Sequence, residues 1–317
     1  MIQKVIHLFI TITMFIVPLC EAVAQRSQYY AIQRYIGGKN VAVLDSAKIR
    51  ISYSLNYVSD STKPQQVMKD RKVLLIGNEW THFYSYYVHQ ADSAATANSD
   101  KGKTFSRFKM PAGVAEEGYE VFTHISTQKR TVLEPITSLS VYRYEELLDT
   151  PQWIISEDTC RILSYLCQKA TARFRGRDWT VWFSPEVPLN TGPWKLGGLP
   201  GLILKAADSK NHYVFECIGI EQLRKVQQPI IMLQASANYI KCNRTEYRKA
   251  QKQFYDNNVN TLLSLGFNVY IVDDTGKKVD EIRTPNTIFE ERNVSYGTSV
   301  NIADRYKKIP YNPIELE

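Results

Sequence analysis

The sequence lacks the short motifs by which several large enzyme classes are recognised. It contains no His-Glu-x-x-His, no Gly-x-Ser-x-Gly, no phosphate-binding Gly-x-x-x-x-Gly-Lys-Ser/Thr and no Gly-x-Gly-x-x-Gly. Motifs therefore do not indicate a zinc protease, an α/β-hydrolase, a P-loop nucleotidase or a dinucleotide-binding enzyme. The few histidines form no close pair at metal-ligand spacing, so neither a metal site nor a cofactor is predicted.

The chain also has few features of membrane-spanning, nucleic-acid-binding or multidomain proteins. Beyond residue 24, no stretch approaches the roughly 20 apolar residues that span a bilayer. The formal net charge is +7, but the basic residues are scattered, so nucleic acid is not a predicted partner. Neither an internal repeat nor a linker rich in Pro, Gly and Ser is present. We predict a single domain over residues 25–317 with a flexible excursion near residues 91–113.

The first residues have the pattern of a secretory signal peptide. Lys4 precedes an apolar run, Val5–Leu19, and Ala22-Val23-Ala24 has the A-x-A form of a signal-peptidase site. Residues 1–24 are therefore predicted to be cleaved after Ala24. The mature protein is expected to be exported and to be periplasmic or associated with the outer membrane.

The most informative feature is a loop rich in glycine, proline and apolar residues, Gly192–Leu204, which we call the signature loop. Its sequence is Gly-Pro-Trp-Lys-Leu-Gly-Gly-Leu-Pro-Gly-Leu-Ile-Leu. Pro200 and Gly201 predict a type II turn over Leu199–Leu202. The loop either fills the open mouth of a curved sheet or forms a docking surface. In the second case the candidate ligand- or partner-binding residues are Trp194, Leu196, Leu199, Pro200, Gly201 and Leu202.

Residue for residue, this loop resembles the signature of the GLPGLI family of exported Bacteroidetes proteins. The approach Trp-Phe-x-Pro-Glu-x-Pro, at residues 182–188, recurs in that family as well. Family members are similar to the bowl-like N-terminal domain of some bacterial peptide-N-glycosidases, a module without catalytic residues of its own. The resemblance implies a non-enzymatic accessory protein of the cell envelope, with an outer-membrane uptake receptor or another envelope protein as partner. It leaves open a glycan, a peptide or a lipid as the ligand.

Alternation of apolar and polar residues predicts the fold class, a mainly β (β-rich α+β) protein. We expect a curved antiparallel sheet or half-barrel with one packed C-terminal helix, Glu246–Tyr255. A hairpin is predicted from Ala170, with its turn at Arg175–Asp178. Further strands are predicted at Ile49–Tyr57, Lys72–Gly77, Glu120–Ile125, Leu139–Tyr144, Ile203–Ala207, Tyr213–Ile220, Phe267–Val272 and Lys278–Ile282.

Three arginines in this hairpin form a second candidate site. Arg173, Arg175 and Arg177 alternate along the chain and are expected on the face opposite Phe174, beside Trp182. Guanidinium groups near an indole can grip an anionic or sugar ligand by forked hydrogen bonds and stacking. The alternative is a solvated ladder of charged side chains.

Two acids beside the signature loop, Glu186 and Asp208, are the only catalytic candidates. General acid/base chemistry needs two carboxylates placed on either side of a bound substrate. If they met this condition, the protein would be a hydrolase acting on envelope polymers or glycopeptides.

Four cysteines remain after the predicted cleavage, and an oxidising compartment favours disulfides between them. A bond between Cys160 and Cys167 requires a hairpin that turns near Leu163–Ser164, because bridged Cα atoms lie within about 7 Å. The other candidate pair is Cys217 with Cys242. Buried free thiols are the alternative for all four residues.

Overall fold

The computed structural model describes residues 41–99, 118–137, 140–224, 228–233, 239–256, 268–272, 278–282, 293–297 and 311–317. The chain divides into a larger unit, Ala24–Arg244 with Asn312–Glu317, and a smaller one, Met1–Val23 with Thr245–Tyr311. The predicted signal peptide lies outside the described residues, and the single domain over 25–317 stays a prediction. Within the described ranges, no helix is long and apolar enough to cross a membrane.

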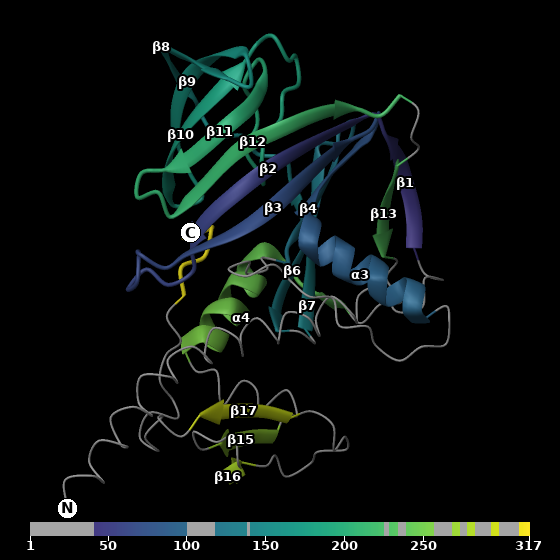
Figure 1. Ribbon diagram of the computed structural model, residues 1–317, viewed down its shortest axis with the longest axis vertical. Coiled ribbons are helices and arrows are strands. Elements are labelled where there is room, and N and C mark those ends of the chain that lie inside the picture. The colour runs from purple at the N-terminus through teal and green to yellow at the C-terminus, as the bar shows by residue number, and fades with distance from the viewer. Residues whose placement is uncertain are drawn as a thin grey trace, which may run out of the picture. The chain divides into compact units, whose positions relative to one another are not determined.

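The larger unit is built on a twelve-stranded sheet (Figure 1). Its strands are β2 (Ile49–Val58), β3 (Val67–Ile76), β4 (Trp80–Ser85), β5 (Glu120–His124), β6 (Lys129–Thr137), β7 (Ser140–Leu147), β8 (Ile154–Ile162), β9 (Tyr165–Phe174), β10 (Arg177–Ser184), β11 (Leu202–Asp208), β12 (Tyr213–Gln222) and β14 (Tyr239–Lys241). They follow the order β14-β7-β6-β5-β4-β3-β2-β12-β11-β10-β9-β8, and only β14 and β7 pair in parallel. The sheet is curved and open, with β14 and β8 as its edges, which confirms the predicted fold class.

One face of the sheet carries the core. Along β2 the alternate residues Ile51, Tyr53, Leu55 and Tyr57 are buried, as their period of two predicts. The Tyr53 hydroxyl donates to the carbonyl of Ile203 at 2.9 Å, so this buried polar group is satisfied. The same face continues on β10 and β12 with further fully buried aromatic side chains: Trp179, Phe183, Tyr213 and Phe215.

A short two-stranded sheet adds a second layer. It pairs β1 (Val41–Ala47) with β13 (Gln228–Leu233). Ile230 and Met232 of β13 belong to a core cluster with Val73, Leu75 and Phe122 of the large sheet. The helix α3 (Tyr86–Ser99) follows β4 directly. The excursion predicted near 91–113 therefore starts as a helix, and residues 100–117 lie outside the described residues.

The smaller unit holds most of α4 (Arg244–Asp256) and a three-stranded sheet. This sheet has the order β16 (Lys278–Ile282), β15 (Asn268–Val272) and β17 (Asn293–Gly297). The helix predicted at Glu246–Tyr255 is confirmed as α4. Its buried side chains, Tyr247 and Gln251, are one turn apart, and the Gln251 amide donates to the hydroxyls of Tyr247 and Tyr311, each at 2.7 Å.

Candidate functional site

The signature loop lies in the core. The side chains of Trp194, Leu196, Leu199 and Leu202 are at most 4% exposed. The indole of Trp194 packs against that of Trp179, with the two ring centroids 5.8 Å apart. This burial matches a loop that fills the sheet rather than one that docks a partner. Gly201 is buried as well, so among the candidate residues of the loop only Pro200 is exposed.

The backbone of this loop differs from the predicted type II turn. The residues with positive φ are Trp194, at 57°, and Gly198, at 88°, and Gly201 is not among them. The Gly201 N–H donates to the carbonyl of Leu199 at 2.8 Å, which closes a three-residue turn at Pro200. Gly201 is needed for space instead, because a Cβ there would lie within 3.0 Å of the neighbouring strand's backbone.

The lysine of the signature loop is fully buried and paired with carboxylates. Its Nζ lies 2.8 Å from Glu146 and 2.6 Å from Glu315, and it donates to the Tyr144 hydroxyl at 3.2 Å. The Lys195 carbonyl accepts a hydrogen bond from Arg130 at 2.8 Å. A buried charge is tolerated only with such compensation. Lys195 therefore fixes the loop from inside, through partners on β7 and in the segment Asn312–Glu317.

The hairpin of the arginine site is tighter than predicted. Its turn consists of Arg175 and Gly176, with φ of 51° and 77°, as in a two-residue type I′ hairpin. Arg177 therefore pairs with Phe174 and shares its face. The prediction that Arg177 lies opposite Phe174 is wrong. Its guanidinium is buried and donates to Asp208 at 2.7 Å.

The other two arginines also separate. Arg175 points toward the end of β7, where it lies 3.3 Å from Glu146 and 2.8 Å from Asp149. Its side chain is only 13% exposed, so its predicted place beside Trp182 is wrong. Arg173 is 62% exposed and lies 3.3 Å from Asp178. Of the three, only Arg173 offers a guanidinium to solvent on the face away from the core.

We call the face of β9–β11 that points away from the core the outer face. Trp182 lies at its centre, half-buried, and is paired in register with Lys169 on one side and Lys205 on the other. Each lysine has a carboxylate partner, Asp158 at 2.8 Å and Glu216 at 3.7 Å. The outer face thus presents an indole between two ion pairs. Cross-strand neighbours of this kind have Cβ atoms about 5 Å apart.

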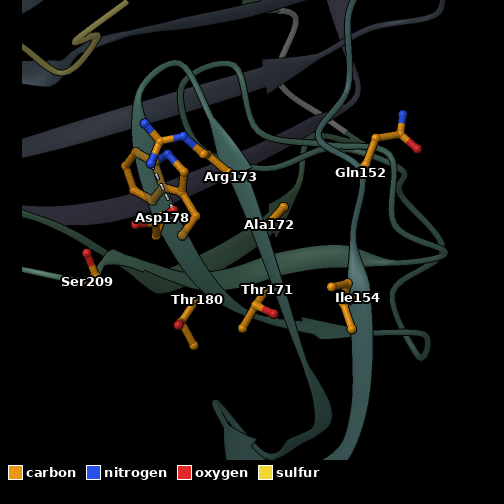
Figure 2. A pocket seen from close by; sticks show the side chains of 9 residues that line it. Gln152, Ile154, Thr171, Ala172, Arg173, Asp178, Thr180 and Ser209 are labelled. Carbon is orange, nitrogen blue, oxygen red and sulfur yellow. Dashed lines mark hydrogen bonds and ion pairs between the residues drawn. The ribbon is translucent and has the colours of Figure 1, made fainter.

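A shallow hollow of about 300 Å³ opens on this face (Figure 2). It is lined by Gln152, Ile154, Thr171, Ala172, Arg173, Asp178, Trp179, Thr180 and Ser209. The ion pair of Arg173 with Asp178 stands at one side, while Gln152 and Ile154 stand at the other. Alternation along β10 places Trp182 on the same face as Thr180 and Asp178. Since Asp178 pairs with Arg173, Trp182 and Arg173 share the outer face, as predicted. The hollow therefore combines hydroxyl, amide, guanidinium and carboxylate groups beside an indole.

The two candidate acids do not share a site. Asp208 is buried against Arg177 and pairs in register with Trp179, near the start of β10. Glu186 is exposed beyond the end of β10 and accepts a hydrogen bond from the N–H of Leu166 at 3.1 Å. At about 3.3 Å per residue, the strand between them spans more than 15 Å. Paired glycosidase carboxylates are within about 10 Å, so this pair is wrong as a hydrolytic centre.

The two candidate cysteine pairs differ in the distance between their members. Cys160 and Cys167 face each other across β8 and β9, joined by the predicted turn at Leu163–Ser164. Both are free thiols here, and burial raises the pKa of Cys167 to about 11. Their disulfide stays a prediction.

Cys217 lies on β12, whereas Cys242 follows β14, with six strands between these two in the sheet order. At about 4.8 Å per strand, their Cα atoms are too far apart for the proposed bond. That pairing is therefore wrong. Within the described ranges, no three His, Cys, Asp or Glu side chains gather as a metal site would require.

Fold and site together define a β-rich protein with an open antiparallel sheet and a polar, aromatic outer face. Residues 111–248 match the family model described as "N-glycanase peptide, N-terminal domain". This match includes β9, β10 and the signature loop. It supports the similarity predicted from the sequence, while membership of the GLPGLI family stays a prediction.

Among solved structures, the chain is similar to PNGF-II in two crystal forms. The P21 form has 13% sequence identity and a TM-score of 0.41, and the C2 form has 14% and 0.40. Each match covers 64% of this chain and 32% of the other. The chain thus spans about a third of the length of the PNGF-II chain. No curated protein matches it.

Sequence reasoning found Arg173 of the hollow and Trp182 beside it, but missed the other residues that line the hollow. The missed residues are Gln152, Ile154, Thr171, Ala172, Asp178, Trp179, Thr180 and Ser209. A signal for two of them was present, because Asp178 and Thr180 alternate with buried residues toward Trp182. Gln152 and Ser209 come from separate connections, and no local pattern points to them.

Proposed function

We propose that this chain is an exported, non-enzymatic binding protein of the cell envelope that holds a glycan or glycopeptide on its outer face. The observation that carries the proposal is the polar hollow beside Trp182. Its volume is at the lower end of the range for small-ligand sites. A sugar ring or two at the end of a longer chain would match this size.

The chemistry of the hollow fits a carbohydrate. Sugars present hydroxyl groups that both donate and accept hydrogen bonds, and the threonine hydroxyls, the Gln152 amide and the Asp178 carboxylate offer both roles. Arg173 supplies a charged donor for an anionic substituent. The half-buried indole of Trp182 provides an apolar surface with a polar edge, which suits the apolar face of a sugar ring.

The comparisons support the ligand class. The matched family is described as the N-terminal domain of an N-glycanase, and the match covers the strands that carry the hollow. A module of that kind would keep a glycosylated substrate close without acting on it. The separation of Glu186 from Asp208 supports binding over hydrolysis by this pair.

Export and the partner protein also belong to this proposal. The signal-peptide pattern of residues 1–24 supports delivery to the periplasm or the outer membrane. An outer-membrane uptake receptor is the proposed partner, to which the chain would present captured glycan. Peptide and lipid remain the alternative ligands, and the binding assay includes both.

An array of N-linked glycans, glycopeptides, unmodified peptides and lipid vesicles tests the ligand class. We expect binding to the glycan-bearing probes, followed by isothermal titration to obtain Kd. Trp182→Ala should weaken binding at least tenfold, whereas Ile218→Ala, an exposed residue of β12, should change Kd less than twofold. Equal loss in both variants, or binding only to unmodified peptides or vesicles, would refute the proposal.

A further inference from the structure

The segment Asn312–Glu317, which we call the strap, lies on the larger unit without joining its sheet. Asn312 is 4% exposed, and each of its polar groups takes part in a hydrogen bond. Its N–H donates to the carbonyl of Ser59 at 2.8 Å, and its side-chain amide donates to that of Val58 at 2.6 Å. Its side-chain oxygen accepts from Arg177 and its carbonyl from Tyr213, each at 2.8 Å.

A second anchor lies three residues further on. Glu315 is 3% exposed, and its carboxylate lies 2.6 Å from the Nζ of Lys195 and 2.7 Å from the Nε of Arg244. Between the anchors, Arg177 donates to the carbonyls of Pro313 and Ile314. The strap is therefore held mainly by charge-assisted hydrogen bonds, which resemble the contacts of a bound peptide.

Charge complementarity runs along the whole strap. Its only charged side chains are Glu315 and Glu317, and both meet cations of the larger unit. Glu317 lies 3.0 Å from Arg173, at the outer end of the segment. An acidic, extended segment thus fits a row of basic side chains.

The basic side chains also keep partners of their own. Lys195 lies 2.8 Å from Glu146, and Arg177 lies 2.7 Å from Asp208, without any part of the strap. Breaking a buried ion pair is costly because it leaves a charge uncompensated. Here, departure of the strap leaves both buried cations compensated. The site can therefore exist empty, unlike an ordinary core contact.

We propose that these residues form an acceptor site for an acidic, extended peptide with asparagine three residues before glutamate, and that the strap fills it in cis as a releasable ligand. The chain leaves the larger unit at Arg244 and re-enters it at Asn312. Since Arg244 also binds Glu315, the filled site links the two positions at which residues 245–311 leave and rejoin the larger unit. Release of the strap would break this link.

Hydrogen exchange on the unmodified full chain gives the first test. We expect the hydrogen-bonded amides of Asn312 and Leu316 to exchange at least tenfold faster than amides of β2 and β12, because the strap opens without global unfolding. Equal protection of strap and sheet would overturn the proposal.

Peptide exchange gives the second test. A specific protease sequence is inserted between residues 304 and 305 of the full chain, and the folded protein is cut. We expect the strap fragment to stay bound and then to be displaced by a labelled peptide of sequence Tyr-Asn-Pro-Ile-Glu-Leu-Glu. The peptide with Glu315→Gln should bind at least tenfold more weakly, and the Glu317→Gln peptide less than threefold. Equal binding of the wild-type and Glu315→Gln peptides, no displacement over a day, or unfolding when the strap leaves would each overturn it.

Discussion

Replacing Glu315 by glutamine removes one buried negative charge and keeps the shape of the side chain. Burial alone would raise the pKa of Glu315, but Lys195 and Arg244 lower it from 4.5 to about 2. Because each pKa unit equals about 1.4 kcal/mol, the ionised carboxylate stabilises the folded state by about 3 kcal/mol at neutral pH. Glu315→Gln should reduce the free energy of unfolding by a comparable amount.

The pH dependence follows from the direction of this shift. Since the folded-state pKa is lowered, the stabilisation is fully present above pH 4.5 and is lost as the pH falls through about 2. At pH 3 it should amount to only about 1 kcal/mol. The difference between wild type and Glu315→Gln should therefore shrink by more than half between pH 7 and pH 3.

Guanidinium unfolding followed by tryptophan fluorescence at both pH values measures this difference. Glu317→Gln is the matched control, because that carboxylate is 63% exposed and solvent screens its pairing with the exposed Arg173, which should contribute little to stability. If Glu315→Gln were as stable as wild type at pH 7, or if its deficit were the same at pH 3, the buried ion pairs would not hold the strap as described.

Three further predictions concern the signature loop and the cysteines. Leu199→Ala should lower the free energy of unfolding by about 2–5 kcal/mol, and Leu199→Asp should prevent folding; an unchanged melting temperature would place this side chain on the surface. Gly201→Ala should destabilise the fold in thermal melts, because its Cβ would meet the Ser184 carbonyl, and a neutral result would contradict the close approach. Under oxidising refolding, Cys160 and Cys167 should form a disulfide detectable by non-reducing peptide mass spectrometry, and two alkylated thiols would exclude it.

Strands with one buried face could be predicted from the sequence, because their apolar residues alternate. β2 is the clearest case, since its observed bounds and buried residues match the alternation. β8 gave no such signal, because it is an edge strand whose residues are mostly exposed on both faces. β3 begins earlier than predicted. Its charged residues Asp70 and Lys72 do not read as core residues in the sequence, but both side chains are fully buried because they form an ion pair at 2.9 Å.

The site was predicted only where short-range pattern determines it. The hairpin and the exposed position of Arg173 follow from alternation along β9 and β10. The burial of Arg177 does not, because its partners Asp208 and Asn312 lie 31 and 135 positions further along the chain. Likewise, the type II turn was inferred from Pro200 and Gly201 alone, whereas contact with another strand sets the conformation there.

Site-specific crosslinking tests most directly whether the outer face binds a glycan, as proposed above. A photo-crosslinking residue at Thr180, in the hollow, is compared with one at Ile218, outside it, during exposure to a pool of N-glycopeptides and unmodified peptides. Mass spectrometry should find glycan-bearing adducts at Thr180 and few at Ile218. Equal labelling at the two positions, or adducts of unmodified peptides alone, would contradict glycan binding by the outer face.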